Sequence, residues 1–437
     1  MSTDLILVGD CGGTNSRLRL YSVAPNARVE NNLPPGDLVK WSEYQNAEYE
    51  GKGGFPAIVR AFMSSAPAVT ETPTAACLAV AGPVESNRVV FTNRNWVIDG
   101  ADLEKTLGIQ RVRLVNDFVA NGYGLLTLDH EKECVCLQRA PHVAGAPIAC
   151  IGAGTGLGEC FSTATEVGKE YDTYASEGGH AEFAPRNDLE TELLTFLKKK
   201  FAQRNRVSVE RVVSGTGLAN VYEFLSTKYK SKVIKAVHDE FLAAGDMRGK
   251  VIAMHSRKDG AAPYCGLCAQ TMQIFAAAYG SEAGVLGLKF IPLNGLYVAG
   301  GLTPKNIELL RGGGDASPFM QAFHDKGRVS PLLKKIPLYA VMAEDIGQRG
   351  AHLVAFKQLE ICRLHSSSSA PPRARKPLFR STTSFGMGFM GSAAAHESHH
   401  EEWHRGWWRE PTAWVAAAAV AGVSFAVGLS AAKKGRA

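Results

Sequence analysis

Two polar residues follow a short apolar run in the segment Leu114-Val115-Asn116-Asp117-Phe118, and their types suit proton transfer. Side chains at the end of a strand in an open α/β sheet lie at the edge where ligands bind. An unpaired carboxylate at this edge, here Asp117, can accept a proton from a hydroxyl as that hydroxyl attacks phosphorus. The spacing by itself favours another interpretation, in which the Asn-Asp pair caps the following helix.

Three glycine-rich segments follow other apolar runs and could approach an anion or a flat ring closely. In GDCGGTN, which starts at Gly9, backbone N–H groups can turn toward phosphate oxygens, and Asp10 can hold a magnesium ion through water. The segment GAGTGLG, around Gly154, could pack against phosphates, although it lacks the Lys-Ser/Thr pair of a P-loop. The pair Gly300-Gly301 would admit adenine. Each segment also suits an ordinary turn or, for the last pair, helix packing.

A carboxylate and an imidazole lie three residues apart in SEGGHAEF, at Glu177 and His180. Together they offer acceptors and a donor for the hydroxyls of a polyhydroxylated ligand. The spacing could also suggest a metal pair, but no third ligand at a suitable spacing accompanies it, so we do not expect a metal there. Glu210 precedes a further glycine turn, and by itself it reads as a solvated helix residue.

Short apolar runs alternate with helical patterns over most of the chain, and this alternation favours an α/β architecture. We expect strands at Leu5–Val8, Ala76–Val80, Val112–Leu114, Ile148–Ile151 and Leu296–Val298. We expect helices at Asp188–Arg204, Val233–Ala244 and Ala269–Phe290. The length of 437 residues exceeds one ordinary core, so two domains are expected.

The composition indicates a globular chain without a nucleic-acid partner. Hydrophobic residues make up 45% and charged residues 21% of the chain. The net charge of +6 is small for this length, and no dense Lys/Arg block occurs in the body. Nine cysteines show no disulfide-like spacing, and the first expected strand leaves no room for a signal peptide. We therefore expect a reducing, cytoplasmic compartment for the body.

The composition changes abruptly after Cys362. Serine-, proline- and arginine-rich sequence there predicts a flexible linker. Residues 414–432 then run without a charge, over about the length of a membrane-spanning helix, and nearby tryptophans suit the aromatic belt of a bilayer. We expect this tail to anchor the protein in the outer membrane of an organelle. The alternative is a helix of small residues that packs on the globular body.

Taken in order, seven segments of the chain resemble the bacterial-type glucokinase family, within the actin-like ATPase superfamily of sugar kinases. They are GDCGGTN, LAVAGPV with FTNRNW, LVNDF, GAGTGLG, EGGHAEFAP, ERVVSGTGL and LYVAGGL. The resemblance covers about residues 4 to 355. Any one segment is weak evidence for the family, but seven in the expected order make a specific match. If the resemblance were accidental, each ordinary alternative given above would have to hold independently.

The resemblance implies an α/β fold with the two-domain architecture of actin-like ATPases (ribonuclease H-like) and a ligand cleft between the domains. The small domain would comprise residues 1–115 plus 345–362, and the large domain residues 116–344. Residues 363–411 would form the flexible linker and residues 412–437 the membrane anchor. A homodimer is left open.

The resemblance also assigns site residues by matching position. Asp117 would be the catalytic base. Glucose hydroxyls would contact Asn93, Asn116, Glu177, His180 and Glu210. ATP would contact Gly9, Asp10, Cys11, Gly12, Gly13, Thr14, Gly154, Thr155, Gly156, Gly300 and Gly301, and Asp10 would hold Mg²⁺ through water. The chain departs from the usual family residues at Cys11, Ser176 and Thr216, none of which removes a group that the chemistry needs.

The activity implied by the resemblance is transfer of the γ-phosphoryl of MgATP to the 6-hydroxyl of glucose, which gives glucose 6-phosphate for glycolysis. One alternative is a non-catalytic, membrane-tethered glucose sensor, against which the intact Asp10, Asp117 and glycine loops argue. The other alternative is a kinase for another hexose, which the sequence excludes poorly.

Overall fold

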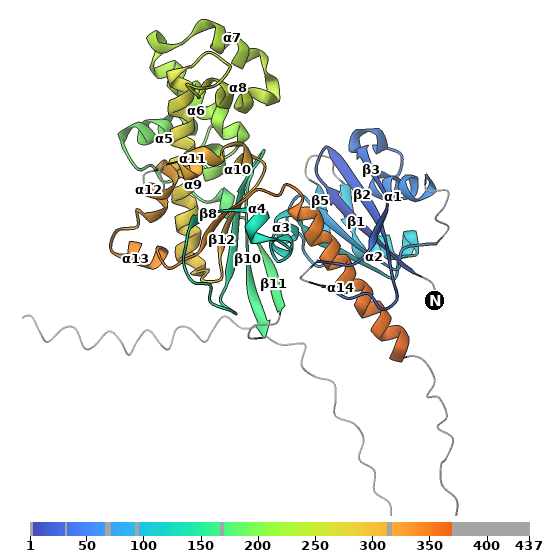
Figure 1. Cartoon of the computed structure of the whole chain (residues 1–437). Coiled ribbons are helices and arrows are strands. Elements are labelled where there is room, and N and C mark those ends of the chain that lie inside the picture. The colour runs from blue at the N-terminus through green and yellow to red at the C-terminus, as the bar shows by residue number, and fades with distance from the viewer. Residues whose placement is uncertain are drawn as a thin grey trace, which may run out of the picture. The chain divides into compact units, whose positions relative to one another are not determined.

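A computed structural model describes residues 3–30, 33–65, 71–91, 96–166, 170–312 and 317–368 (Figure 1). All of these residues belong to one compact unit, Met1–Pro371. Asn93 and the predicted anchor at 414–432 lie outside the described residues. Within the described ranges, no helix combines the length and the apolar character that crossing a membrane requires.

The first sheet contains five strands in the order β3-β2-β1-β4-β7. Their bounds are β1 Asp4–Cys11, β2 Asn15–Val23, β3 Asp37–Gln45, β4 Ala75–Val80 and β7 Arg111–Asn116. Strands β1, β2 and β3 form an antiparallel meander, whereas β4 pairs parallel to β1 and β7 pairs parallel to β4. The apolar run at the N-terminus becomes the central strand β1 because both of its faces are covered.

The second sheet contains six strands in the order β11-β10-β9-β12-β13-β8. Their bounds are β8 Cys134–Gln138, β9 Ile148–Ala153, β10 Leu157–Glu166, β11 Glu170–Ser176, β12 Leu296–Ala299 and β13 Leu338–Val341. Again an antiparallel meander, β9 to β11, is followed by two parallel strands, β12 and β13. A separate pair consists of β5 Arg88–Phe91 and β6 Trp96–Asp99.

Five strands of the second sheet, β9 to β13, therefore repeat the topology of the first sheet. In each set, numbered along the chain, the strands lie side by side in the order third, second, first, fourth, fifth. The second sheet adds β8 at its edge, antiparallel to β13. This repeated arrangement is the ribonuclease H-like unit of the actin-like ATPases, so the predicted fold class is confirmed. All five predicted strands are present, each extended by one to three residues at one or both ends.

Helices cover both sheets (Figure 1). Beside the first sheet and at its junction with the second are α1 Gly54–Ser64, α2 Gly100–Leu107, α3 Asp117–Leu125, α4 His130–Glu133 and α14 Ile346–Ser368. The others are α5 Asp188–Lys200, α6 Gly215–Lys228, α7 Lys235–Ala243, α8 Arg248–His255, α9 Gly266–Phe290, α10 Leu302–Lys305, α11 Ile307–Arg311, α12 Pro318–His324 and α13 Ser330–Leu333. The three predicted helices correspond to α5, α7 and α9; the first residue of α5 and the last of α9 are as predicted, and the other ends are shifted by one to four residues.

Helix α14, drawn in orange in Figure 1, returns from the end of the second sheet to the first. Its residues Ala351, Ala355 and Phe356 pack against Ile6 and Val8 of β1 in a buried cluster. The helix continues past Cys362 to Ser368. The returning helix that the resemblance implied is therefore present and covers one face of the first sheet.

Helices α3 and α14 contact each other through glycines. A Cβ at Gly124 of α3 would lie 1.9 Å from the carbonyl oxygen of Ile346. A Cβ at Gly350 of α14 would lie 1.8 Å from the carbonyl oxygen of Ala120. The two backbones can approach this closely only because neither position carries a side chain. This contact fixes α3, whose first residue is Asp117.

Candidate active site

A cavity of about 460 Å³ lies where β7, the β9–β10 turn and the end of β12 come together. It takes residues from both sheets and from the turn η2 Gly178–His180, which follows β11. The lining residues are Gly82, Asn116, Asp117, Phe118, Asn121, Gly152, Gly154, Thr155, Gly156, Leu157, Gly158, Ser176, Glu177, His180, Glu210 and Gly300.

Asn116 and Asp117 differ in their contacts at the start of α3. The Oδ1 atom of Asn116 accepts hydrogen bonds from the backbone N–H groups of Phe118 (2.9 Å) and Val119 (3.3 Å), so Asn116 is the N-cap of α3. Its Nδ2 atom donates to the carbonyl oxygen of Gly82 at 3.1 Å. Asp117 begins the helix, and its Oδ1 atom accepts from the Phe118 N–H at 2.9 Å.

The environment of Asp117 makes its carboxylate a stronger base than an ordinary aspartate. Burial, with smaller contributions from the charges of Asp10 and Glu177, raises the pKa of Asp117 to about 6, against the lowering effect of the Phe118 N–H. At neutral pH the carboxylate is still ionised and can accept a proton. Its pKa lies close to the operating pH, which favours proton transfer to a general base.

The second glycine segment forms the tight turn between β9 and β10. The backbone N–H of Gly154 donates to the carbonyl oxygen of Gly156 at 2.8 Å, and the carbonyl oxygen of Gly154 accepts from Gly215 at 2.8 Å. A Cβ at Gly158 would lie 2.0 Å from the ring of Phe118, the neighbour of Asp117. The absence of a side chain at Gly158 thus lets the turn pack directly against the residue that follows the carboxylate.

Glu177, His180 and Glu210 reach the same cavity from two short turns. The Oε2 atom of Glu177 lies 3.9 Å from the Nε2 atom of His180, and both side chains are exposed. Glu210 lies in the 3₁₀ turn η3 Val209–Arg211, not in a solvated helix. Its Oε2 atom accepts from the backbone N–H of Leu157 at 3.0 Å. Glu210 therefore joins its own turn to the second glycine segment.

The first glycine segment, Gly9–Thr14, forms the hairpin turn between β1 and β2 and does not line this cavity. Within it, burial raises the pKa of Asp10, while Arg17, whose Nη1 atom lies 3.6 Å from Asp10 Oδ2, lowers it. The negative charge of Asp10 contributes to the raised pKa of Asp117. The thiol of Cys11 is buried in the core, which leaves the backbone of Cys11 for any ligand.

The cavity brings together nine of the residues that the sequence singled out. They are Asn116, Asp117, Gly154, Thr155, Gly156, Glu177, His180, Glu210 and Gly300. Gly301 follows Gly300 and precedes α10. The sequence argument missed several lining residues, including Gly82, Asn121 and Ser176. For Asn121 a signal existed, because it lies one helical turn after Asp117 and so on the same face of α3.

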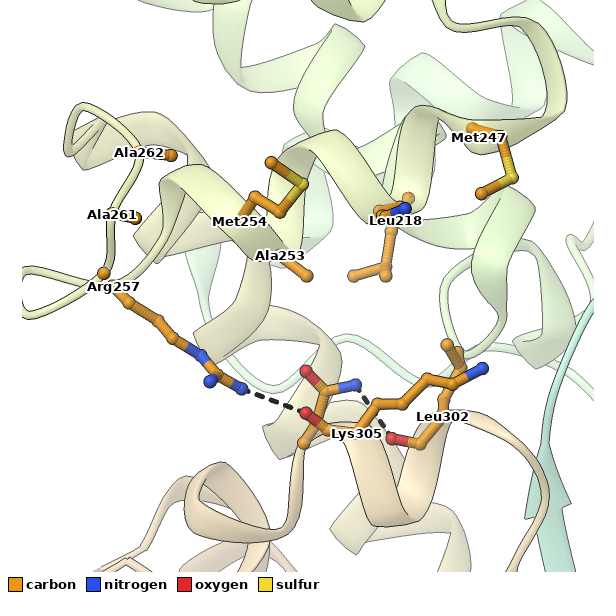
Figure 2. Close-up of a pocket in the computed structure, with 13 residues that line it drawn as sticks. Leu218, Met247, Ala253, Met254, Arg257, Ala261, Ala262, Leu302 and Lys305 are labelled. Carbon is orange, nitrogen blue, oxygen red and sulfur yellow. Dashed lines mark hydrogen bonds between the residues drawn. The ribbon is translucent and has the colours of Figure 1, made fainter. Parts of the chain in front are cut away.

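A second cavity, of about 610 Å³, lies beyond Gly301 between α6, α8 and α10 (Figure 2). Leu218, Met247, Met254 and Leu302 give it apolar walls. Lys305 closes one side of the cavity. Its carbonyl oxygen accepts a hydrogen bond at 3.0 Å from the side chain of Arg257, which also lines the cavity. The cavity is therefore apolar with a cationic edge.

The two cavities are connected through backbone contacts between glycines. Gly300 lines the first cavity, and Leu302, two residues further along the chain, lines the second. The backbone N–H of Gly215 donates to the carbonyl oxygen of Gly154. Gly215 also lies close to Gly249, which lines the second cavity: a Cβ at Gly249 would be 2.9 Å from the Gly215 carbonyl oxygen. The walls of the two cavities are therefore joined by a packed backbone segment that runs from Gly249 through Gly215 to Gly154.

Comparison with known proteins gives the family. The model of the glucokinase family matches residues 7–358. The glucokinase of Synechocystis sp. is 40% identical over 360 residues, covering 80% of this chain and 97% of its own length. That of Trichormus variabilis is 39% identical over 367 residues, covering 80% and 98%. The crystal structure of a glucokinase from an Antarctic psychrotroph aligns with a TM-score of 0.61 and 27% identity over 81% of this chain and 99% of that one. The motifs, the repeated topology and these matches agree, and the chain belongs to the glucokinase family.

Proposed function

We propose that this chain is an ATP-dependent glucokinase, which transfers the γ-phosphoryl of ATP to the 6-hydroxyl of glucose. The observation that carries the proposal is the position of Asp117, whose carboxylate shares one cavity with a glycine turn and with Glu177 and His180. A general base, a phosphate-sized backbone cradle and donors and acceptors for sugar hydroxyls are the three components that hexose phosphorylation needs. Membership of the glucokinase family supports the same activity.

The sugar would lie between Asp117 and the two short turns. Glu177 and Glu210 offer carboxylate acceptors, and His180 offers one donor and one acceptor in its neutral form. The side chain of Asn116 already caps α3 and donates to Gly82, so it can give the sugar only its second amide N–H. Asn93 stays a predicted sugar contact, because it lies outside the described residues.

The phosphates would lie over Gly154–Gly156, with the first glycine segment on their other side. Mg²⁺ retains much of its hydration and is usually held by one or two carboxylates together with substrate phosphates. Asp10 would fit that pattern, because it is a partly buried carboxylate at the end of β1 whose charge acts on Asp117, and Arg17 lies 3.6 Å from it. The metal would neutralise charge on the phosphates.

The second cavity would hold the adenosine. A flat ring fits between the apolar side chains of Leu218, Met254 and Leu302, and Lys305 lies at the edge where the ribose would emerge (Figure 2). Gly300 and Gly301, which precede Leu302 in the chain, would then border the adenine. The phosphates follow the glycine contacts from this cavity toward Gly154, which directs the terminal phosphoryl to the cavity of Asp117.

In the proposed mechanism Asp117 orients the 6-hydroxyl and accepts its proton late, because the transition state of phosphoryl transfer is loose and positioning contributes most of the rate. Glu177, His180 and Glu210 hold the other hydroxyls, so that the reacting oxygen lies in line with the bond that breaks. Closure of the two halves around the substrates would expel water and limit ATP hydrolysis.

The decisive experiment measures ADP release with glucose, mannose, fructose and N-acetylglucosamine as separate acceptors. The proposal predicts the highest kcat/KM with glucose. Glucose binding without any turnover would instead identify a sensor, and a higher kcat/KM with another sugar would identify a different hexose kinase. A homodimer is tested in the same samples by sedimentation velocity.

The membrane location is a separate proposal about residues 414–432, which lie outside the described residues. If these residues anchor the kinase, the full-length protein should sediment with membranes after cell fractionation. A chain that ends at Ser368, the last residue of α14, should remain in the supernatant. Full-length protein in the supernatant with its tail intact would eliminate the anchor.

A further inference from the structure

A buried carboxyl group lies directly beneath the turn that carries Glu177 and His180. It belongs to Glu159 of β10, which is 1% exposed and pairs across the sheet with Ser176, the residue before Glu177. Its Oε1 atom has no hydrogen-bond partner among the described residues. Buried carboxyl groups are normally paired, so an unpaired one requires an explanation.

The carboxyl of Glu159 supports the turn by direct contact. A Cβ at Gly178 would lie only 1.8 Å from Glu159 Oε2, so the carboxyl fills the space in front of the Gly178 backbone. The next residue, Gly179, is equally close to β10, because a Cβ there would lie 2.0 Å from the Leu157 carbonyl oxygen. The turn η2 therefore contacts β10 through the Glu159 carboxyl at Gly178 and through the Leu157 backbone at Gly179, and the size of the group at Glu159 sets the distance of Gly178 from the strand.

We propose that Glu159 is a positioning residue that holds Glu177 and His180 at the sugar by supporting the turn between them. The inference rests on the proposed role of Glu177 and His180 in binding glucose. Glu159 itself does not line the cavity, so it acts only through the turn.

The surroundings of Glu159 favour a neutral carboxyl. Burial, together with the negative charge of Glu282, raises the pKa of Glu159 to about 8, against the lowering effect of Lys289. Glu282 on α9 is 7% exposed, its Oε1 atom also lacks a partner among the described residues, and its pKa is raised chiefly by burial. The titratable groups that interact with the Glu159 carboxyl are Glu282, Lys289, Tyr279 and Cys160, and Lys326 interacts with Glu282.

A neutral carboxyl beneath the turn gives glucose binding a defined pH dependence. At a pH below the pKa of Glu159, its carboxyl group is uncharged and packs closely against the backbone of Gly178. At a pH above the pKa of Glu159, a buried carboxylate would form beneath Glu177. Its need for solvation and its repulsion of the Glu177 carboxylate would both displace the turn. If only the protonated form binds well, glucose affinity should fall about tenfold between pH 7 and pH 9.

The test compares the full-length wild type with the variants Glu159→Gln, Glu159→Ala and Glu282→Gln. Glucose binding is measured by titration calorimetry without nucleotide at several pH values from 7 to 9, and kcat is measured at saturating glucose. We expect Glu159→Gln to bind as tightly as the wild type at pH 7 and to lose the alkaline weakening. Glu159→Ala should bind about tenfold more weakly at every pH, with kcat nearly unchanged.

Glu282→Gln is the matched control, because it removes a second buried carboxyl of the same cluster that does not touch the turn. It should bind glucose normally at pH 7, and its alkaline weakening should begin at a lower pH, since the charge that raises the pKa of Glu159 is gone. An unchanged midpoint in this variant would assign the titration to another group and overturn the inference.

Two further results would overturn the inference while leaving the proposed function intact. One is wild-type affinity in Glu159→Ala, and the other is an alkaline weakening in Glu159→Gln equal to that of the wild type. If Glu159→Ala does not fold, Glu159→Gln alone still decides the question. A wild type that binds no glucose at any pH would refute the proposed function itself.

Discussion

The pH dependence of turnover is the most direct consequence of the environment of Asp117. An aspartate with its ordinary pKa of 3.8 would be almost fully ionised at pH 5. With a pKa of about 6, Asp117 is ionised in about nine molecules of ten at pH 7 and in about one of ten at pH 5. Because only the carboxylate can accept the proton, kcat/KM for glucose should fall about tenfold between these two pH values.

The assay should quantify ADP by chromatography in quenched samples, so that no coupling enzyme contributes its own pH dependence. The ratio kcat/KM is the appropriate quantity, because it reports the ionisation of the free enzyme. The control is Asp117→Asn, which should turn over about 10²- to 10⁴-fold more slowly and should lack the acid limb. Glucose binding to this variant should be largely retained.

The same pKa shift predicts that the variant is more stable than the wild type. The pKa of Asp117 is higher in the folded chain than in the unfolded chain, so the folded state binds the proton more tightly and stability falls as pH rises from about 4 to 6. Asparagine carries no charge, so Asp117→Asn should raise the free energy of unfolding at pH 7 by up to about 3 kcal/mol, measured by denaturant titration.

An acid limb centred near pH 4 would refute the argument that burial sets the basicity of Asp117. Turnover of Asp117→Asn close to that of the wild type would remove the residue from its role as base. If Asp117→Asn has low turnover but the stability of the wild type, Asp117 keeps its catalytic role, but its ionised carboxylate does not destabilise the fold at pH 7.

Four further substitutions test other parts of the site. Gly158→Ala places a methyl group 2.0 Å from the ring of Phe118 and should cost about 1–3 kcal/mol of stability, measured by denaturant titration. Gly154→Ala, with nothing within 4 Å of its Cβ, should cost much less. Equal losses of stability in the two variants would contradict the close packing at Gly158. Glu210→Gln should weaken glucose binding at least about tenfold in calorimetry, because a charged acceptor that anchors the second glycine segment becomes neutral. Ala253→Trp should fill the second cavity and raise the KM for ATP about tenfold while leaving the KM for glucose unchanged; the opposite pattern would remove adenosine from that cavity.

The elements were predictable because burial leaves a local signal. Apolar runs such as Leu5–Val8 and Ile148–Ile151 became central strands, since a strand covered on both faces must be apolar throughout. The order of strands in each sheet was not readable from local patterns and came only from the family resemblance. The ends of helices shifted, as at Lys200, where the apolar periodicity stops before the basic residues do.

The site was only partly predictable, because it depends on contacts between distant segments. Locally, the Asn-Asp pair indicated a cap or a base, and the structure assigns the cap to Asn116 and leaves Asp117 facing the cavity. No local pattern shows that the Leu157 N–H meets Glu210, or that Glu159 lies under Gly178. A glutamate in a strand of alternating pattern reads as a solvent-facing residue until the buried face is known.

The position of α14 has a consequence for how the chain folds as it is synthesised. One face of the first sheet, which includes Ile6, Val8 and Ala79, is buried by Ala355 and Phe356 of α14. The ribosome makes α14 only after every strand of the second sheet has been synthesised. During translation the first sheet therefore presents an uncovered apolar face, whereas the second sheet can pack with its own helices. The half of the molecule that is synthesised first is thus the last to be completed, and it is the half that depends most on protection from aggregation during synthesis.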